Sequence, residues 1–295
     1  MGTFCARFGG KWGSLPDKPE ETVEATVRAL WLRAAGLRVS AVKAMDTLLP
    51  SLNAEQLEDL EELMEQRVLG IPLAHLTGRQ SFMGLEFICT KDALIPRKET
   101  EILARAACEL LESEISARKA RPRVLDLCCG SGNIACAIAH RIPTCQVFAA
   151  DLSTEAVELA KENARVLGVV ERLEFHTGDL FAPFELEEYS GSFDLIACNP
   201  PYISNGKLAL LPAEIARHEP RLAFDGGPLG LAVLWKLLEQ APRFLKPDGW
   251  LVFEAGLGQG PGLLRRLSKS VAYRDVKGVC DGEGNPRVIL ARVAA

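Results

Sequence analysis

Asn199-Pro200-Pro201-Tyr202 is the segment of the sequence whose residue types most directly suggest chemistry. The side-chain oxygen of Asn199 and the backbone oxygen of Pro200 are two acceptors, and proline has no N–H that would compete beside them. Two acceptors suit the two N–H groups of a planar amide or amine, whose delocalised lone pair makes its nitrogen a poor nucleophile. Because these contacts strengthen as the nitrogen becomes positive, the segment predicts a site that alkylates such a nitrogen.

The two prolines stiffen this segment, so that its acceptors are held in place before a substrate arrives. The ring of Tyr202 offers a flat face for the substrate group and for the developing cation. We therefore predict that Asn199, Pro200 and Tyr202 are catalytic and that Pro201 joins them in binding the substrate. A rigid polar turn after a strand is the structural alternative.

A glycine-rich segment follows the apolar run that ends at Asp126 and leads into a predicted helix. Gly130 and Gly132 allow the backbone to turn tightly and to approach a ligand at a place where a Cβ would collide. The pattern indicates a nucleotide-type site, with an ordinary turn as the alternative. Asp126, Cys128, Gly130 and Gly132 are its predicted cofactor-binding residues.

Two further acids follow later predicted strands. Asp151 stands where a carboxylate can accept from both hydroxyls of a ribose, although capping of the next helix would also explain it. Asp179, followed by Leu180, stands where it can accept from an adenine amino group, or is an ordinary turn residue. Because carboxylates repel phosphates, three acids beside a short glycine-rich segment favour S-adenosylmethionine over a dinucleotide. Leu152 and Leu180 are also predicted to bind this cofactor.

Alternating strand and helix patterns explain how these residues come together. The predicted strands are 124–127, 147–150, 173–175, 195–197 and 251–253, and the predicted helices are around 134–139, 156–167 and 229–245. Repeated strand–helix units imply an α/β fold with a parallel sheet covered on both faces. Ligands bind beyond the carboxyl ends of such strands near the topological switch point, and the predicted site residues follow those ends.

The region before the sheet has a different pattern. Helical spacing from about residue 20 to 70 predicts a small helical domain, with Asn53 as an N-cap and with Gly36 and Gly70 where helices end. The period then changes around Gly84, which predicts a β-hairpin. We expect these domain boundaries: a flexible tail over 1–18, a helical domain over 19–72, a hairpin linker over 73–96 and the α/β domain over 97–295.

Composition narrows the classes of protein and of partner. The formal net charge of -5 gives no overall basic footprint, so direct nucleic-acid binding is not expected. The sequence contains no run of about 18 apolar residues, so a membrane span is not expected. Nine cysteines without a Cys-x-x-Cys pattern indicate reduced thiols, hence the cytoplasm. The acid-poor first residues leave an organellar presequence as the alternative. The histidines form no His-Glu-x-x-His pattern, so no metal is expected.

Several motifs make the sequence similar to the HemK family, the peptide chain release factor glutamine N5-methyltransferases. The resemblance extends over nearly all of 72–293 and includes PLAHLTG (72–78), SFMGLEF (81–87), IPRKETE (95–101), the glycine-rich segment (126–133), NPPY (199–202), HEPR (218–221) and EAG (254–256). It implies a class I methyltransferase sheet with a small N-terminal helical domain joined by a β-hairpin. It also implies S-adenosyl-L-methionine as the methyl donor, which leaves as S-adenosyl-L-homocysteine. We expect a monomer that needs no metal.

The resemblance also assigns roles to residues. It implies that Asp151 binds the ribose and Asp179 lies near the adenine, while Asn199 and Pro200 hold the substrate amide between Tyr202 and Phe82. The implied substrate is the glutamine of the Gly-Gly-Gln motif in class 1 peptide chain release factors, gripped in part by the helical domain.

Departures from the family pattern keep other substrates open. Cys128-Cys129 replaces a common Gly-Thr, and Lys98 replaces a common proline. The cysteine-rich segment and Leu211-Pro212-x-Glu214 are also similar to enzymes that methylate a glutamine of a ribosomal protein. Adenine-N6 methylation of DNA or RNA would use the same acceptors, and a non-catalytic S-adenosylmethionine-binding protein is a third alternative.

Overall fold

The structure, a computed structural model, describes residues 18–115 and 121–294. The chain forms two units: one contains the N-terminal residues up to Lys98 together with Leu211–Pro220, and the other contains Glu99–Leu210 and Arg221–Ala295. The predicted flexible tail and the presequence alternative fall on residues that, except for Lys18, lie outside the described ones. Lys18 itself is buried, and its Nζ lies 3.3 Å from Oε1 of Glu214.

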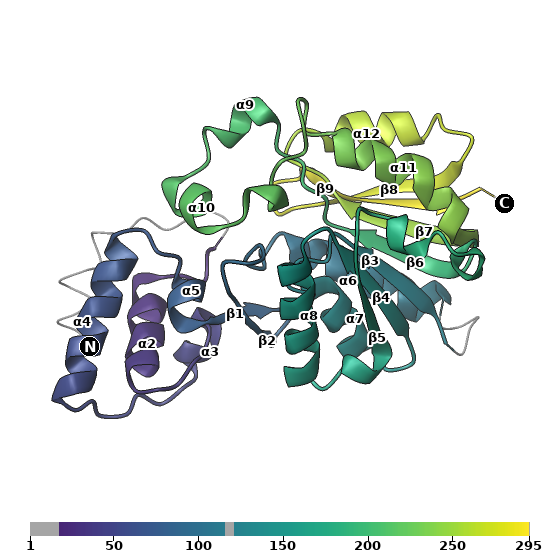
Figure 1. Cartoon of the computed structure of the whole chain (residues 1–295). Helices are drawn as coiled ribbons and strands as arrows, with labels where there is room; N and C mark the ends of the chain where they lie inside the picture. Colours follow the sequence, from purple (N-terminus) through teal and green to yellow (C-terminus); the bar gives the residue numbers. More distant parts are fainter. Residues whose placement is uncertain (1–17, 116–120, 295) are drawn as a thin grey trace. The chain divides into compact units, whose positions relative to one another are not determined.

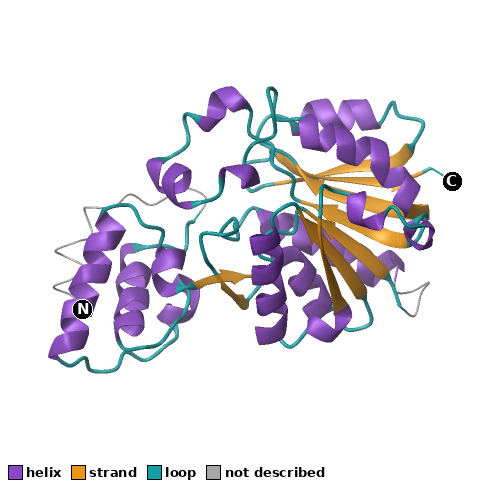
Figure 2. Ribbon diagram, in the orientation of Figure 1, coloured by secondary structure: helices purple, strands orange, loops and turns teal. Residues whose placement is uncertain are grey.

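The first unit is built from short helices and one hairpin (Figures 1 and 2). Its elements are α2 (Val23–Ala34), α3 (Ala41–Met45), α4 (Ala54–Val68), α5 (Leu73–Thr77), β1 (Arg79–Phe82), β2 (Leu85–Ile88) and α10 (Ala213–His218). Asn53 caps α4, and its side chain and that of Gln56 form a reciprocal capping box. Gly36 and Gly70 follow α2 and α4 with φ of 88° and 91°, which confirms the predicted cap and helix ends.

The hairpin of the first unit turns at Met83 and Gly84. These two residues have φ of 52° and 78°, and Phe82 pairs with Leu85 on either side of them. Positive φ at both central residues is the two-residue turn whose twist matches that of paired strands. The ring of Phe82 is buried and meets that of Phe87 edge to face, with 6.1 Å between centroids.

Residues 211–220 belong to the first unit although they lie far along the chain. Glu214 of α10 accepts from Arg67 of α4 at 2.8 Å. Glu219 is buried and accepts from the backbone N of Ile95 at 3.0 Å and from the guanidinium of Arg97. The IPRKETE and HEPR motifs thus meet in this unit. The prediction of one α/β domain over 97–295 did not include this exchange, in which 211–220 fold with the N-terminal residues.

The second unit contains a seven-stranded sheet of order β5-β4-β3-β6-β7-β9-β8. The strands are β3 (Arg123–Leu127), β4 (Gln146–Asp151), β5 (Leu173–Thr177), β6 (Phe193–Cys198), β7 (Leu245–Glu254), β8 (Tyr273–Cys280) and β9 (Pro286–Val293). The first five strands run parallel, which confirms the predicted α/β class. The parallel sheet predicted from these five strands is incomplete, because the structure adds β8 and β9, and β9 runs antiparallel to β7 and β8. A short turn joins β8 to β9, and parallel neighbours would need a longer crossover.

Helices cover both faces of this sheet (Figure 1). One face carries α6 (Thr100–Leu110), α7 (Asn133–Arg141) and α8 (Thr154–Val166), and the other carries α11 (Ala232–Phe244) and α12 (Gly260–Leu267). Shorter elements are η1 (Leu111–Ile115), η2 (Val170–Arg172), η3 (Ala182–Phe184), η4 (Glu187–Tyr189), α9 (Asn205–Leu208) and η5 (Arg221–Ala223). Within the described ranges, no helix is long and apolar enough to cross a bilayer.

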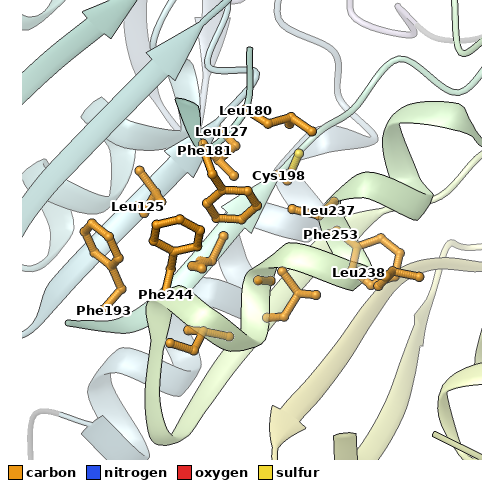
Figure 3. Packing of buried hydrophobic residues seen from close by; sticks show 14 of the residues in the cluster. Leu125, Leu127, Leu180, Phe181, Phe193, Cys198, Leu237, Leu238, Phe244 and Phe253 are labelled. Atoms are coloured by element: carbon orange, nitrogen blue, oxygen red, sulfur yellow. The ribbon is translucent and has the colours of Figure 1, made fainter. Parts of the chain in front are cut away.

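The core between the sheet and α11 is aromatic and aliphatic (Figure 3). Leu125 and Leu127 alternate with residues of the other face along β3 and pack beneath α11. Phe181 and Phe244 stack with 4.5 Å between ring centroids and 7° between planes. This packing fixes the strands whose carboxyl ends bear the predicted site residues.

Candidate active site

The predicted site residues of the second unit follow the carboxyl ends of adjacent strands. The chain leaves β3 toward β4 and β5 on one side, then returns to β6 and β7 on the other, so the topological switch point lies between β3 and β6. Leu127 pairs with Cys198 across it. The glycine-rich loop and the Asn-Pro-Pro-Tyr loop therefore begin side by side, with Asp151 at the end of β4 and Glu254 at the end of β7 flanking them.

The glycine-rich loop depends on left-handed backbone conformations. Cys128, Gly130 and Gly132 have φ of 57°, 53° and 76°. A Cβ on Gly132 would lie 2.9 Å from the Cβ of Ala160 in α8, so only glycine lets the two elements approach this closely. Cys128 adopts a conformation that glycine would adopt more readily, which gives a physical reason for glycine being common at this position in the similar family.

The carboxylate of Asp151 supports the loop from the neighbouring strand. Its Oδ2 accepts from the backbone N of Gly130 at 2.8 Å, and its Oδ1 accepts from the backbone N of Ser153 at 3.0 Å. The hydrogen bond to Ser153, the N-cap residue of α8, agrees with the alternative prediction that Asp151 caps this helix. Each oxygen retains a second acceptor position, so hydrogen bonds from ribose hydroxyls are chemically compatible with both contacts. Burial raises the pKa of Asp151.

Asp126 is buried beneath the same loop. Its Oδ2 accepts from the backbone N of Ala135 at 3.0 Å and joins β3 to α7. Its Oδ1 is buried without a hydrogen-bond partner among the described residues. Burial raises the pKa of Asp126 to about 8, because desolvation disfavours the charged form.

The residues predicted near the adenine differ in accessibility. Asp179 is exposed and its Oδ2 lies 3.1 Å from Nζ of Lys236. Leu180 has φ of 48° and its side chain belongs to the core, as Figure 3 shows. Leu152, directly after Asp151, is 53% exposed and offers apolar surface that a flat ligand group could cover. An exposed leucine directly after Asp151 suits an uncharged base joined to a ribose.

The Asn-Pro-Pro-Tyr loop is oriented by side chains from distant parts of the second unit. Nδ2 of Asn199 donates to Oγ1 of Thr100 at 3.1 Å. The hydroxyl of Tyr202 donates to Oε1 of Glu254 at 2.9 Å. Among the described residues, none donates a hydrogen bond to Oδ1 of Asn199 or to the carbonyl oxygen of Pro200. Both acceptors that the sequence predicts thus retain their capacity to bind N–H groups.

Gln259 and Gly230 hold the same loop from another side. Nε2 of Gln259 donates to the carbonyl oxygens of Tyr202 and Gly230, each at 3.2 Å, while its Oε1 accepts from the N of Gly256 at 2.9 Å. A Cβ on Gly230 would lie 2.2 Å from the carbonyl oxygen of Tyr202, so a larger residue there would displace the loop.

Sequence reasoning did not identify Thr100, Glu254, Gln259 or Gly230 as residues of the site. Glu254 could have been found, because it is an acid at the carboxyl end of a strand, the rule that selected Asp126 and Asp151. Phe82, predicted to flank the substrate, lies in the hairpin of the first unit. Lys98 is exposed.

The donor set of the second unit is compatible with S-adenosylmethionine. Gly130 and Gly132 turn the backbone through left-handed conformations, and the carboxylate of Asp151 beside this turn has acceptor positions that suit a ligand that carries hydroxyls and positive charge. In the described parts of the chain, no group of three or more His, Cys, Asp or Glu residues is arranged to hold a metal ion.

Comparison with known proteins agrees with this arrangement. A family model described as a methyltransferase domain matches residues 118–275. The catalytic domain of hMettl16, solved with the MAT2A 3′UTR hairpin 6, is 15% identical with a TM-score of 0.54 over 79% of this chain and 82% of that chain, and shows a shared fold. The chain is therefore a methyltransferase of the class that uses S-adenosylmethionine, as the sequence predicted.

Its family follows from curated relatives. The release factor glutamine methyltransferase of Moorella thermoacetica is 40% identical over 231 residues, which cover 78% of each protein. The protein of the same name from Geobacter sulfurreducens is 34% identical over 281 residues, which cover 95% of this chain and 93% of the relative. The chain belongs to the release factor glutamine methyltransferase family, which confirms the resemblance drawn from its motifs.

Proposed function

We propose that this enzyme transfers a methyl group from S-adenosyl-L-methionine to the side-chain amide N5 of the glutamine in the Gly-Gly-Gln motif of a class 1 peptide chain release factor. Its relatives are named release factor glutamine methyltransferases. The observation that carries the chemistry is the orientation of Asn199, whose Nδ2 donates to Thr100, so that its Oδ1 can accept from a substrate.

The cofactor is assigned to the carboxyl ends of β3 to β6. Its residues are Asp126, Cys128, Gly130, Gly132, Asp151, Leu152, Asp179, Leu180 and Asn199. When bound, S-adenosylmethionine supplies a methyl group on a positively charged sulfur. The acids around it are suited to a cationic nucleoside and unsuited to a pyrophosphate, because carboxylates repel phosphate charge.

The substrate amide is assigned to the Asn-Pro-Pro-Tyr loop. Oδ1 of Asn199 and the carbonyl oxygen of Pro200 accept from the two N–H groups, which directs the nitrogen lone pair toward the methyl group. Tyr202 is proposed to lie against the flat amide, Pro201 keeps the loop rigid, and Phe82 is the second aromatic residue proposed for the substrate. As the nitrogen gains charge its N–H groups donate more strongly, so both acceptors stabilise the transition state more than the ground state.

The release factor is the proposed partner, and the helical residues 19–72 are proposed to recognise it. We propose a monomeric enzyme that acts in the cytoplasm without binding nucleic acid directly. The formal net charge of -5 and the free thiols of all the cysteines within the described ranges support this setting.

A labelling experiment tests the acceptor. The full chain is incubated with methyl-labelled S-adenosylmethionine and, separately, with a class 1 release factor, its Gly-Gly-Gln→Gly-Gly-Ala variant, ribosomal proteins and adenine-containing DNA. We expect label on the release factor and none on the variant. Label that survives the Gln→Ala change, or that appears only on a ribosomal protein or on DNA, would reject the proposed substrate.

A further inference from the structure

Glu254, at the end of β7, connects two residues of the proposed substrate site. It is 2% exposed, and its oxygens have separate partners. Oε2 accepts from the hydroxyl of Thr100 at 2.8 Å, and Oε1 accepts from the hydroxyl of Tyr202 at 2.9 Å. Thr100 also accepts from Nδ2 of Asn199 at 3.1 Å. One buried carboxylate therefore contacts Tyr202 directly and Asn199 through a single hydroxyl.

The direction of these hydrogen bonds fixes the amide of Asn199. A threonine hydroxyl has one proton, and an ionised carboxylate has none. Because the Thr100 proton goes to Glu254, the oxygen of Thr100 can only accept from the group on its other side. Asn199 must then turn its NH2 toward Thr100 and its Oδ1 away. The opposite orientation would present two donors to a substrate that itself donates.

We propose that Glu254 is a positioning residue, which keeps Oδ1 of Asn199 available as an acceptor through Thr100 and holds the ring of Tyr202 through its hydroxyl. This inference deepens the proposed methylation of an amide nitrogen and rests on it. Neither Glu254 nor Thr100 needs to touch the substrate. Their effect is expected in the rate of methyl transfer, because it depends on acceptors aligned before the reaction.

The ionised state of Glu254 depends on the groups around it. Burial raises the pKa of Glu254, while hydrogen bonds from Thr100 and Tyr202 and the charge of Arg287, whose Nη2 lies 3.7 Å from Oε1, lower it. The carboxylate of Glu99 raises it slightly. Protonation would require one oxygen to donate, which disturbs one of the two contacts. The turnover of the wild type should therefore decrease as pH falls through this raised pKa.

The matched variants Thr100→Val and Thr100→Ser separate positioning from packing. Valine keeps the shape of threonine without the hydroxyl, whereas serine keeps the hydroxyl and loses a methyl group. We expect Thr100→Val to lower kcat about tenfold or more, the equivalent of one hydrogen bond, and Thr100→Ser to stay near the wild type. KM and the Kd of S-adenosylmethionine, measured by calorimetry, should change little in both.

Glu254→Gln tests the carboxylate itself. Glutamine has one acceptor oxygen and one NH2, so it cannot accept from both hydroxyls. We expect kcat to fall at least as far as in Thr100→Val, and the acidic limb of the kcat profile to disappear. Combining Glu254→Gln with Thr100→Val should cost much less than the product of the single effects, because both break one relay.

Clear outcomes would overturn the positioning role. Equal loss of kcat in Thr100→Val and Thr100→Ser would make Thr100 a packing residue, and an unchanged kcat in Thr100→Val would remove the relay altogether. Failure of the proposed function is distinguishable from these outcomes. In that case the wild-type enzyme would label another acceptor, or would leave the release factor unlabelled. If another acceptor is labelled, the same variants assayed on it still decide the role of Glu254.

Discussion

The two loops that begin at the switch point are held in different ways. The glycine-rich loop is built within one strand–helix–strand unit, from the backbone of Cys128, Gly130 and Gly132 and from the Asp151 carboxylate at the end of the next strand. The Asn-Pro-Pro-Tyr loop is held by Thr100 and Glu254, which are 154 positions apart in the chain, and by Gln259.

This difference separates what each loop needs. The first needs a backbone shape, which local residue types specify through conformation and close approach. The second needs side-chain acceptors pointing in a defined direction, which requires partners with the right donors and lone pairs. Changes in the first should therefore alter cofactor affinity, and changes in the second should alter the rate of methyl transfer.

The largest expected effect is that of Asn199→Ala. Loss of an acceptor that acts on developing charge should lower kcat about a hundredfold to a thousandfold. The Kd of S-adenosylmethionine by calorimetry should rise far less, because Asn199 is only one of several residues assigned to the cofactor. Asn53→Ala is the control, because it removes a helix cap in the first unit and should cost about 1 kcal/mol of stability without lowering kcat. Loss of cofactor binding together with turnover in Asn199→Ala would make this residue part of the cofactor loop's support.

A smaller effect is expected from Gly132→Ala. The added Cβ would lie 2.9 Å from that of Ala160, and φ of 76° is unfavourable for alanine. The loop must shift, so the Kd of S-adenosylmethionine should rise about tenfold or more, equivalent to about 1.4 kcal/mol. Gly168→Ala is the matched control, because Gly168 has φ of 68° with no atom within 4 Å of the new Cβ. Equal Kd values in the two variants would mean that the close approach at Gly132 is unimportant for the cofactor.

A further effect, on stability and not on turnover or binding, is a pH dependence from Asp126. Its pKa of about 8 in the folded state exceeds its ordinary value of 3.8, so the folded state binds the additional proton between these values. The free energy of unfolding therefore decreases as pH rises from about 4 to about 8 and levels off above that range. Asp126→Asn has no such titrating group, so its stability should not fall in this way. The Tm of the variant minus that of the wild type should increase between about pH 5 and pH 8. A constant difference in Tm across this range would contradict the raised pKa.

Much of the fold was accessible from sequence because its signals are local. The apolar runs of β3 to β7 are bounded by clear turns, and the cap at Asn53 is a local motif. β8 was not predicted, because it is an edge strand that contains Arg274, Asp275 and Lys277, and these charged residues hide the alternation of a half-buried strand. β9 carries a buried apolar run, Val288 to Ala291, that could have indicated a strand.

The site was predictable only in part for the same physical reason. Asn199, Pro200 and Tyr202 can be recognised from donor and acceptor chemistry within four consecutive residues. Thr100 precedes the whole sheet and contributes one hydroxyl, so nothing in its neighbourhood indicates a contact with Asn199. Such a relay emerges only when the strand order brings β6 beside β7 and the start of α6 near both.

The chain passes between its two units three times, at 98/99, 210/211 and 220/221. An exchange of the N-terminal residues with those of a relative must therefore include 211–220. Otherwise Glu214 and Glu219 would face the relative's residues in place of Arg67 and Arg97, and where these are not basic, breaking one buried ion pair costs about 3–5 kcal/mol. The residues up to 98 and those of 211–220 are thus far apart in the gene but must remain compatible with each other. A hybrid enzyme joined at a single point would combine parts of the first unit from two different proteins.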